Sequence, residues 1–256
     1  MTHRVRDPKS RLVLTIFLAL TLPVVSFGQL RVIMSGGFAV AYQELLPEFE
    51  KTTGITVSTT RGPSQGNGPD TIGAQLRRGL PADVVIMNRE GLEELLAAGK
   101  IAAGTNVDLA RVPLGLSVRA GAPKPDISNV AAFTQAVRDA RSIASNSSAA
   151  IYLKQKLLPR LGMTDAAAKI ADKGAPAVAS GESDLVVLPV SELLHVPGVD
   201  FVGVIPAEVQ QISVFSAAVV AGSKQIEEAK RLVAFLRSAS AAPAIKRSGM
   251  EQAPKP

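Results

Sequence analysis

Three apolar segments alternate with two amphipathic segments between residues 30 and 87. The apolar segments Leu30–Met34, Ile55–Thr60 and Asp83–Met87 predict buried strands, and the segments between them predict helices. This alternation is typical of a parallel sheet whose strands are joined by helical crossovers. Ligands of open α/β sheets collect at the carboxyl ends of the strands, where loops deliver backbone N–H groups. We therefore expect the binding site at the loops that follow the first two strands.

The first of these loops contains two consecutive glycines and opens a helix. Apolar residues recur near helical spacing over residues 38–51. No acidic side chain occupies the start of this helix, so its free N–H groups suit an anion. The alternative is that the glycines only allow a tight turn between strand and helix. The ligand-binding residues predicted here are Ser35, Gly36, Gly37 and Phe38.

The second loop, RGPSQG, begins at the end of a strand with Arg61. A guanidinium there can bind a carboxylate with two parallel hydrogen bonds, which a lysine cannot reproduce. The alternative is a surface arginine paired with a nearby carboxylate. Ser64 adds a hydroxyl donor, and Asp70 is expected to cap a helix over residues 69–78. We therefore expect Arg61 and Ser64 to contact the ligand.

A later region repeats the same organisation. A strand over residues 142–144 runs into the sequence SNSSAA and then into the helix IYLKQKLLPRL. Junctions of this kind are capping sequences by default. Here Ser147, Ser148 and Ala149 would present hydroxyl and N–H groups to the ligand from a second lobe. Further along, the pattern predicts a helix over residues 165–172.

Two proline-containing segments, Val107–Leu116 and Pro206–Ser213, predict crossovers between the two lobes. Each lobe is expected to be a mainly parallel sheet flanked by helices, with the ligand in the cleft between the lobes. The tail after Gly249 is expected to fray. The predicted division is a signal peptide over 1–28, a first lobe over 29–111 and 213–256, and a second lobe over 112–212.

The first 28 residues are typical of a secretory signal. A basic stretch precedes the apolar run Leu12–Phe27, and small residues stand at Ser26 and Gly28. A membrane anchor is the alternative, but the run is shorter than the roughly 20 residues of a spanning helix and contains Pro23. The absence of cysteine excludes disulfides, thiolate zinc sites, thiol catalysis and a lipid-modified cysteine. We expect a protein of the Gram-negative periplasm with its signal cleaved near Gly28.

Composition excludes several classes of function. The formal charge of +6 falls to +3 without the signal, and the chain has no Trp and no clustered basic run, so a nucleic-acid surface is not expected. His195 is the one histidine outside the signal, which excludes ordinary zinc sites and is typical of a half-buried residue at a helix end. Neither a dinucleotide fingerprint nor a Walker loop occurs. We predict neither a cofactor nor a metal.

Several segments resemble one known family in order and spacing. The segments LPEFEKTTGITV, RGPSQG, LPADVVIM, SNSSAAIYLKQKL and the closing EEAKRLVAFLRS are similar to those of periplasmic molybdate-binding proteins of ABC transporters. The resemblance implies the type II periplasmic binding protein fold, with two α/β lobes joined by crossover strands. It also implies that the family's ligand serines fall on Gly37 and Ser64 and that a backbone donor falls on Ala149. The family's ligand tyrosine falls near Leu188-Pro189 and is absent.

Loss of two hydroxyl donors and the presence of Arg61 favour an organic carboxylate over molybdate. We therefore expect a monomeric solute-binding protein that captures a small anion and delivers it to a membrane ABC permease. The chain also resembles aconitate isomerase, of the same divergent branch, through loops such as RGPS and RAGAPKPDIS. That resemblance implies, as an alternative, an enzyme that moves a proton along an allylic tricarboxylate. Binding ranks first because candidate bases are few: Asp70, Glu208 and His195.

Overall fold

The structure of the protein is a computed structural model that describes residues 28–254. The strands are β1 (Leu30–Met34), β2 (Val57–Arg61), β3 (Val84–Asn88), β4 (Val107–Arg119), β5 (Ile143–Ser145), β6 (Ile170–Asp172), β7 (Leu185–Pro189), β8 (Val199–Val204), β9 (Ile212–Val219) and β10 (Glu251–Gln252). The α-helices are α1 (Ala39–Thr53), α2 (Ile72–Arg77), α3 (Arg89–Ala97), α4 (Val130–Asp139), α5 (Ser147–Tyr152), α6 (Leu158–Arg160), α7 (Pro176–Ala179), α8 (Ile226–Arg237) and α9 (Ala242–Arg247). The π-helix η2 (Leu153–Leu157) joins α5 to α6, and short 3-10 helices are η1 (Gly36–Phe38), η3 (Thr164–Lys169), η4 (Val190–Glu192), η5 (Ala207–Val209) and η6 (Ala239–Ala241).

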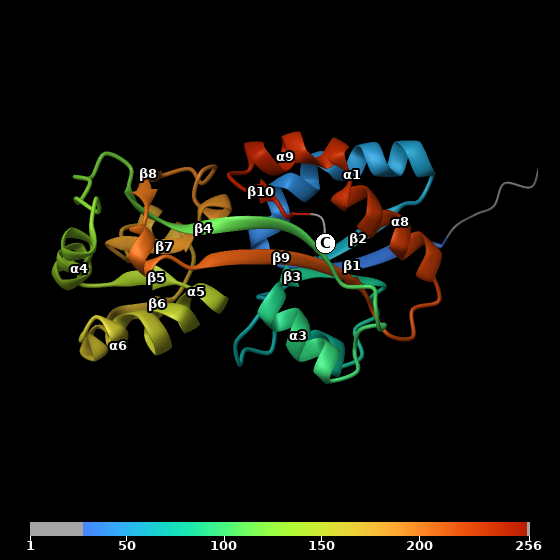
Figure 1. The fold of residues 1–256 in the computed structure, drawn as a ribbon, viewed down its shortest axis with the longest axis horizontal. Helices are drawn as coiled ribbons and strands as arrows, with labels where there is room; N and C mark the ends of the chain where they lie inside the picture. The colour runs from blue at the N-terminus through green and yellow to red at the C-terminus, as the bar shows by residue number, and fades with distance from the viewer. Residues whose placement is uncertain (1–27, 255–256) are drawn as a thin grey trace, which may run out of the picture.

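These strands form one hydrogen-bonded network in the order β2-β1-β3-β9-β4-β7-β5-β6, with β8 and β10 both paired to β4. Parallel pairs occur at its two ends, in β2-β1-β3 and in β6-β5-β7. The long strands β4 and β9 are antiparallel and run side by side between the two groups of elements (Figure 1). The first half of β4 pairs with β9, whereas Leu114–Val118 pairs with β7. The two groups are therefore connected through β4 and through the segment that enters β9.

The group at the N-terminal end of the network has a core on each face of its sheet. Val32 and Ile86 belong to a core shared with α1, α8 and α9. The neighbouring Ile33 and Val85 belong to a second core, shared with α2 and α3. Figure 1 shows α1, α8 and α9 on one side of these strands and α3 on the other. Burial on both faces explains why the central strand β3 is an apolar run. The expectation of a buried strand at residues 55–60 is wrong, because β2 lies at the edge of the sheet and has no buried residue. We call this group the first lobe.

The other group, which we call the second lobe, packs around a separate core that extends from Leu114 to Val209 and includes Phe133. Some residues of the second lobe also contact the first: Val190, directly after β7, packs in a core of the first lobe, and Phe201 of β8 packs against the same core. The two connections also touch each other, because the Gln210 side chain accepts a hydrogen bond from the Leu114 amide at 2.7 Å and donates one to its carbonyl at 3.0 Å. This side chain pairs with β4 as a neighbouring strand would.

Three expectations about local structure are wrong. The segment 165–172 is not a helix, because η3 ends at Lys169 and β6 follows, held by its ladder with β5. The cap of α2 is Thr71 rather than Asp70, since the Thr71 hydroxyl accepts a hydrogen bond from the Ala74 amide at 3.3 Å. The tail after Gly249 does not fray up to residue 254, because β10 pairs with β4. The first and third expectations fail because strand pairing depends on partners distant in sequence. The second fails because two adjacent residues could both cap the helix.

The predicted signal peptide lies outside the described residues, apart from Gly28. Over residues 28–254, helices are too short or too polar for any of them to span a bilayer.

Candidate functional site

A cavity of about 540 Å³ lies between the two lobes. Its walls are the loops that follow β1 and β2 in the first lobe and β5, β6 and β7 in the second, so it lies at carboxyl ends of parallel strands. Phe215 of β9 also contributes to the lining. The polar and charged residues that line the cavity are Ser35, Arg61, Ser64, Asp70, Asn146, Ser147, Ser148, Asp172, Lys173 and Glu192.

The structure brings most of the predicted ligand-binding residues together at this cavity. The predicted residues that line it are Ser35, Gly36, Arg61, Ser64, Ser147 and Ser148. Phe38 and Ala149 do not line it, because their side chains are buried in the cores of the first and second lobes. Gly37 is also buried, directly behind the lining. The loops that were predicted from the sequence are therefore the loops that meet here.

Ser35 lies at the end of β1, with only 5% of its surface exposed. Its Oγ has no hydrogen-bond partner within residues 28–254. A buried hydroxyl left unpaired costs about 1–3 kcal/mol, so such an atom is usually paired. Because Ser35 lines the cavity, a ligand oxygen placed there can supply the missing partner.

Position 37 requires glycine because an aromatic ring lies very close to it. A Cβ atom at this position would lie 1.9 Å from Cζ of Phe215, well inside van der Waals contact. The serine that the family resemblance places at this position therefore cannot coexist with the observed ring. Phe215 contributes an apolar face to the cavity instead.

Arg61 and Ser64 present polar atoms from the loop after β2. The Arg61 side chain is exposed, and none of the ion pairs in the described part of the chain includes it. Ser64 is buried, and its Oγ accepts a hydrogen bond from the Asn88 amide at 3.0 Å. That bond fixes the oxygen and leaves the hydroxyl proton available to a ligand.

Ser147 faces this loop from the second lobe. Its Oγ accepts a hydrogen bond from the Gln65 amide at 3.1 Å, which joins the two lobes across the cavity. Its φ of 50° is in the left-handed region, and no other non-glycine residue between 28 and 254 has a positive φ. Such a conformation costs roughly 1–2 kcal/mol. Lys173, after β6, adds a cation to the same wall and pairs with Glu182.

Glu192 is a cavity residue that sequence reasoning missed. It ends η4, directly after β7, and its side chain is partly buried. A Cβ atom placed on Gly36 would lie 3.1 Å from Oε2 of Glu192, so the carboxylate of the second lobe packs on the first-lobe loop. Burial raises the pKa of Glu192 to about 7. The available signal was its position, just beyond Leu188-Pro189, where the family resemblance expects a ligand-binding side chain.

The three residues predicted as bases are placed differently. Asp70 lines the cavity. Glu208 lies in η5, outside the lining, and its carbonyl accepts a hydrogen bond from Arg160 at 2.6 Å. His195 is also outside the lining, and its Nε2 lies 3.1 Å from the carbonyl oxygen of Arg247, the last residue of α9. The structure therefore removes Glu208 and His195 as candidates for contact with a ligand.

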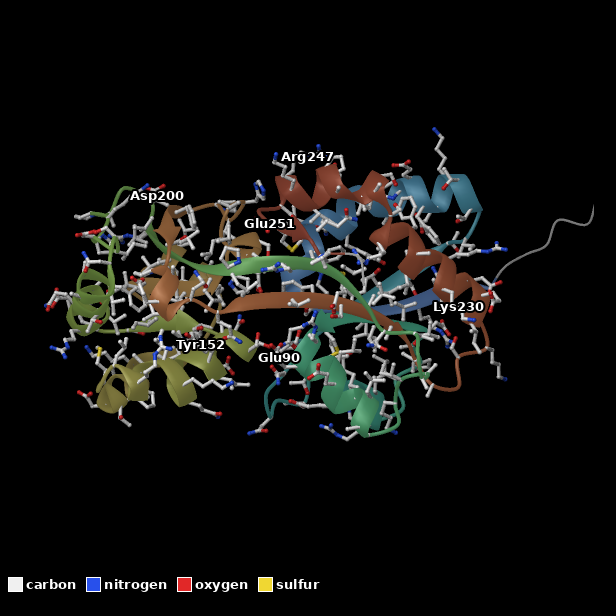
Figure 2. All side chains as sticks on the ribbon, viewed as in Figure 1. Glu90, Tyr152, Asp200, Lys230, Arg247 and Glu251 are labelled. Atoms are coloured by element: carbon white, nitrogen blue, oxygen red, sulfur yellow. The ribbon has the colours of Figure 1, made fainter. Side chains whose placement is uncertain are left out.

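Tyr152 is close to the same wall in sequence but does not line the cavity. Its hydroxyl donates a hydrogen bond to the Val209 carbonyl at 3.0 Å, and its ring packs on the core of the second lobe. In Figure 2 it lies with the helices of the second lobe, while Glu90 lies with α3 of the first. Tyr152 is therefore a packing residue.

Comparisons with known proteins identify relatives of the whole described chain. Residues 30–251 match the family described as bacterial extracellular solute-binding protein. An aconitate isomerase of Pseudomonas sp. is 40% identical over 231 residues, which are 88% of each chain.

Among solved structures, the Azotobacter vinelandii periplasmic molybdate-binding protein matches with a TM-score of 0.70 at 23% identity, over 89% of this chain and all of that one. The sulfate-binding protein SubI of Mycobacterium tuberculosis H37Rv matches with a TM-score of 0.69 at 16% identity, over 88% and 86%. These likenesses confirm the predicted two-lobed α/β binding-protein fold.

The expectation of a carrier for an ABC permease was wrong. The relative at 40% identity is an enzyme, and this identity is far higher than that to the binding proteins of known structure. The 40% identity favours the alternative that the sequence left open, an isomerase on this fold. The resemblance to molybdate-binding proteins holds for the fold.

Proposed function

Because the chain belongs to the bacterial extracellular solute-binding protein family, we propose that it is an isomerase that uses the family's ligand cleft as its active site. The reaction is the interconversion of trans- and cis-aconitate. The observation that carries this proposal is the 40% identity, over 88% of both chains, to an aconitate isomerase. The cavity supports it, because it combines cations, hydroxyls and carboxylates in one place.

The arrangement of donors suits a small tricarboxylate. A cavity of about 540 Å³ is within the usual range of roughly 300–1,000 Å³ for small-molecule sites. Three groups of donors line it from different loops, and each can hold one carboxylate. The proposed groups are Ser35 with Gly36, Arg61 with Ser64, and Ser147 and Ser148 with Lys173.

The chemistry needs a base and positive charge. A base removes a proton from the methylene group, and the electron pair spreads over the allylic carbons and the attached carboxylates. Return of a proton to the other end of that system moves the double bond and changes its geometry without an oxidant or cofactor. Arg61 and Lys173 stabilise the negative charge that develops on the carboxylates.

The donors come from both lobes, so substrate binding favours approach of the lobes. We assign residues 29–111 and 213–256 to one lobe and 112–212 to the other. Movement is confined to the two connections that Gln210 ties together at Leu114. Closure excludes water from the reacting carbons, which strengthens the electrostatic interactions of the site.

We assign the enzyme to the periplasm, released by cleavage near Gly28. An apolar run preceded by basic residues supports export, and the family is extracellular.

Proton NMR of trans-aconitate incubated with the purified protein tests the proposed function. We expect resonances of cis-aconitate to appear until the two isomers reach the same ratio from either starting compound. Protein heated to unfolding is the control. Saturable binding of trans-aconitate without any conversion would reject an enzyme and leave a receptor.

A further inference from the structure

Glu192 differs from the other carboxylates of the cavity in its surroundings. Asp70 and Asp172 are exposed to solvent, whereas Glu192 is partly buried at the seam where the second lobe meets the first. None of the ion pairs among residues 28–254 includes Glu192. Burial raises its pKa to about 7. A carboxylate without a cationic partner and with this pKa is a stronger base than an ordinary glutamate and still ionises near neutral pH.

The fold also positions Glu192 toward the donors. Its backbone is anchored on both sides: Val190 packs in a core of the first lobe, and Leu193 packs in the core of the second. Its Oε2 lies against Gly36, the residue that follows Ser35, whose hydroxyl is unpaired. A carboxylate of the substrate held by that loop would therefore bring its neighbouring carbon close to Glu192.

From this geometry we infer that Glu192 is the catalytic base of the isomerisation, an assignment that rests on the proposed function. Its carboxylate takes a proton from the methylene carbon, so a C–H bond breaks and an O–H bond forms. The electron pair moves into the allylic system, where the carboxylates bound by Arg61 and Lys173 share the charge. The carboxyl then returns a proton to the far allylic carbon and is an anion again.

The pH dependence follows from the ionisation that a base requires. Glu192 must be deprotonated to accept the proton, so kcat/KM should rise with pH and level off above a midpoint near 7. The charged groups around it are those of the cavity, Arg61, Lys173, Asp70 and Asp172. Both η1 and β4 pack against η4. The segment η1 carries no charged residue, and β4 meets Val190 at Gly115, away from the charged Arg111 and Arg119 of that strand. Arg247 near Gly249 is paired with Glu44.

The test compares Glu192→Gln with Glu192→Asp and with Glu208→Gln. Glu208 is a matched control, because it is a glutamate of the same lobe outside the lining of the cavity. We expect Glu192→Gln to lower kcat at least 10³-fold while the Kd for trans-aconitate, from calorimetry, changes less than fivefold. Glu192→Asp should keep a slower reaction with the pH midpoint moved, and Glu208→Gln should behave as wild type.

Each outcome decides one of two questions. If wild-type protein isomerises aconitate and Glu192→Gln does so at a similar rate, Glu192 is not the base although the proposed function stands. If Glu192→Gln loses affinity but keeps kcat, Glu192 is a binding residue. If the variant does not fold, the activity and pH midpoint of Glu192→Asp decide, and an unmoved midpoint rejects the assignment. If wild-type protein does not convert aconitate, the assignment fails with the function on which it rests.

Discussion

The two walls of the cleft are built in different ways. On the first-lobe wall, Ser35 and Ser64 are buried, with 5% and 7% of their surfaces exposed, and backbone contacts fix the loops around them. On the second-lobe wall, Ser147 and Ser148 are partly exposed, and Ser147 has a left-handed backbone. The helix that follows them continues as the π-helix η2. The first wall is therefore fixed by packing against its core. The second wall has a strained residue, Ser147, and an irregular helix beside the cavity.

This difference suggests a division of labour. A wall whose donors are fixed before binding loses little entropy when a ligand binds, so we expect the first lobe to set the affinity. A wall with strained and exposed residues can change conformation when the lobes close. Glu192 is located between them, since it belongs to the second lobe but packs on the loop of the first. The predictions below test whether the walls differ in this way.

The largest effect is expected from Gly37→Ser, which places a side chain on the rigid wall. Its Cβ would lie 1.9 Å from the Phe215 ring, so the ring or the loop must move. We expect a loss of about 3 kcal/mol in the free energy of unfolding, at the upper end of the usual cost of overpacking. Urea denaturation measures it. Gly68→Ser is the matched control, because nothing lies within 4 Å of a Cβ there. Equal stability of the two variants would show that the first wall is not rigid.

The next effect concerns Arg61, the cation of the first wall. Replacement by alanine should raise KM for trans-aconitate about 10- to 100-fold, the equivalent of one charged hydrogen-bonding partner worth about 1.5–3 kcal/mol. Replacement by lysine should recover only part of the affinity, because lysine cannot form two parallel bonds. Arg77→Ala controls for the loss of a charge at the end of α2, away from the cavity. An unchanged KM in Arg61→Ala would exclude Arg61 from the site.

A third prediction concerns stability at the boundary between the walls. The pKa of Glu192 is raised by burial from 4.5 to about 7, so the folded state holds its proton more tightly than the unfolded state does. The stability that this group contributes is fully present below pH 4.5 and is lost as pH rises through 7. Glu192→Gln cannot ionise, so its melting temperature should exceed that of wild type at pH 8 and match it near pH 4.5. A difference that does not change with pH would show that Glu192 is not desolvated in the folded protein.

The smallest effect should come from the strained residue of the second wall. Ser147→Ala and Ser147→Gly both remove the hydroxyl that accepts from Gln65, but only glycine adopts a φ of 50° without strain. Ser147→Gly should therefore be about 1 kcal/mol more stable than Ser147→Ala. At Ser148, which has a negative φ, the order should reverse because alanine favours a helix. Thermal unfolding of the four variants measures their stabilities. If alanine is more stable than glycine at both positions, the backbone of Ser147 is not strained.

Local sequence was sufficient for much of the fold and for most of the cavity. β1 begins and ends where the apolar run predicts, and β3 and β5 are within one residue of their predicted limits. Apolar runs and helical periodicity are local signals, so they indicate strands and helices before any tertiary contact is known. The loops with small polar residues at strand ends were also sufficient to place Ser35, Arg61, Ser64 and Ser147 in one cavity, because carboxyl ends of parallel strands meet at one edge.

Only the tertiary structure decided the features that depend on residues far apart in sequence. The strand β10 exists because it pairs with β4, and the ring of Phe215 explains Gly37 although 178 positions separate them. The raised pKa of Glu192 has the same origin, since burial at the seam between two lobes cannot be read from the residues beside it. The sequence by itself determined where polar donors gather. Packing between the lobes determined which carboxylate among them is desolvated, because desolvation depends on what surrounds a group in space.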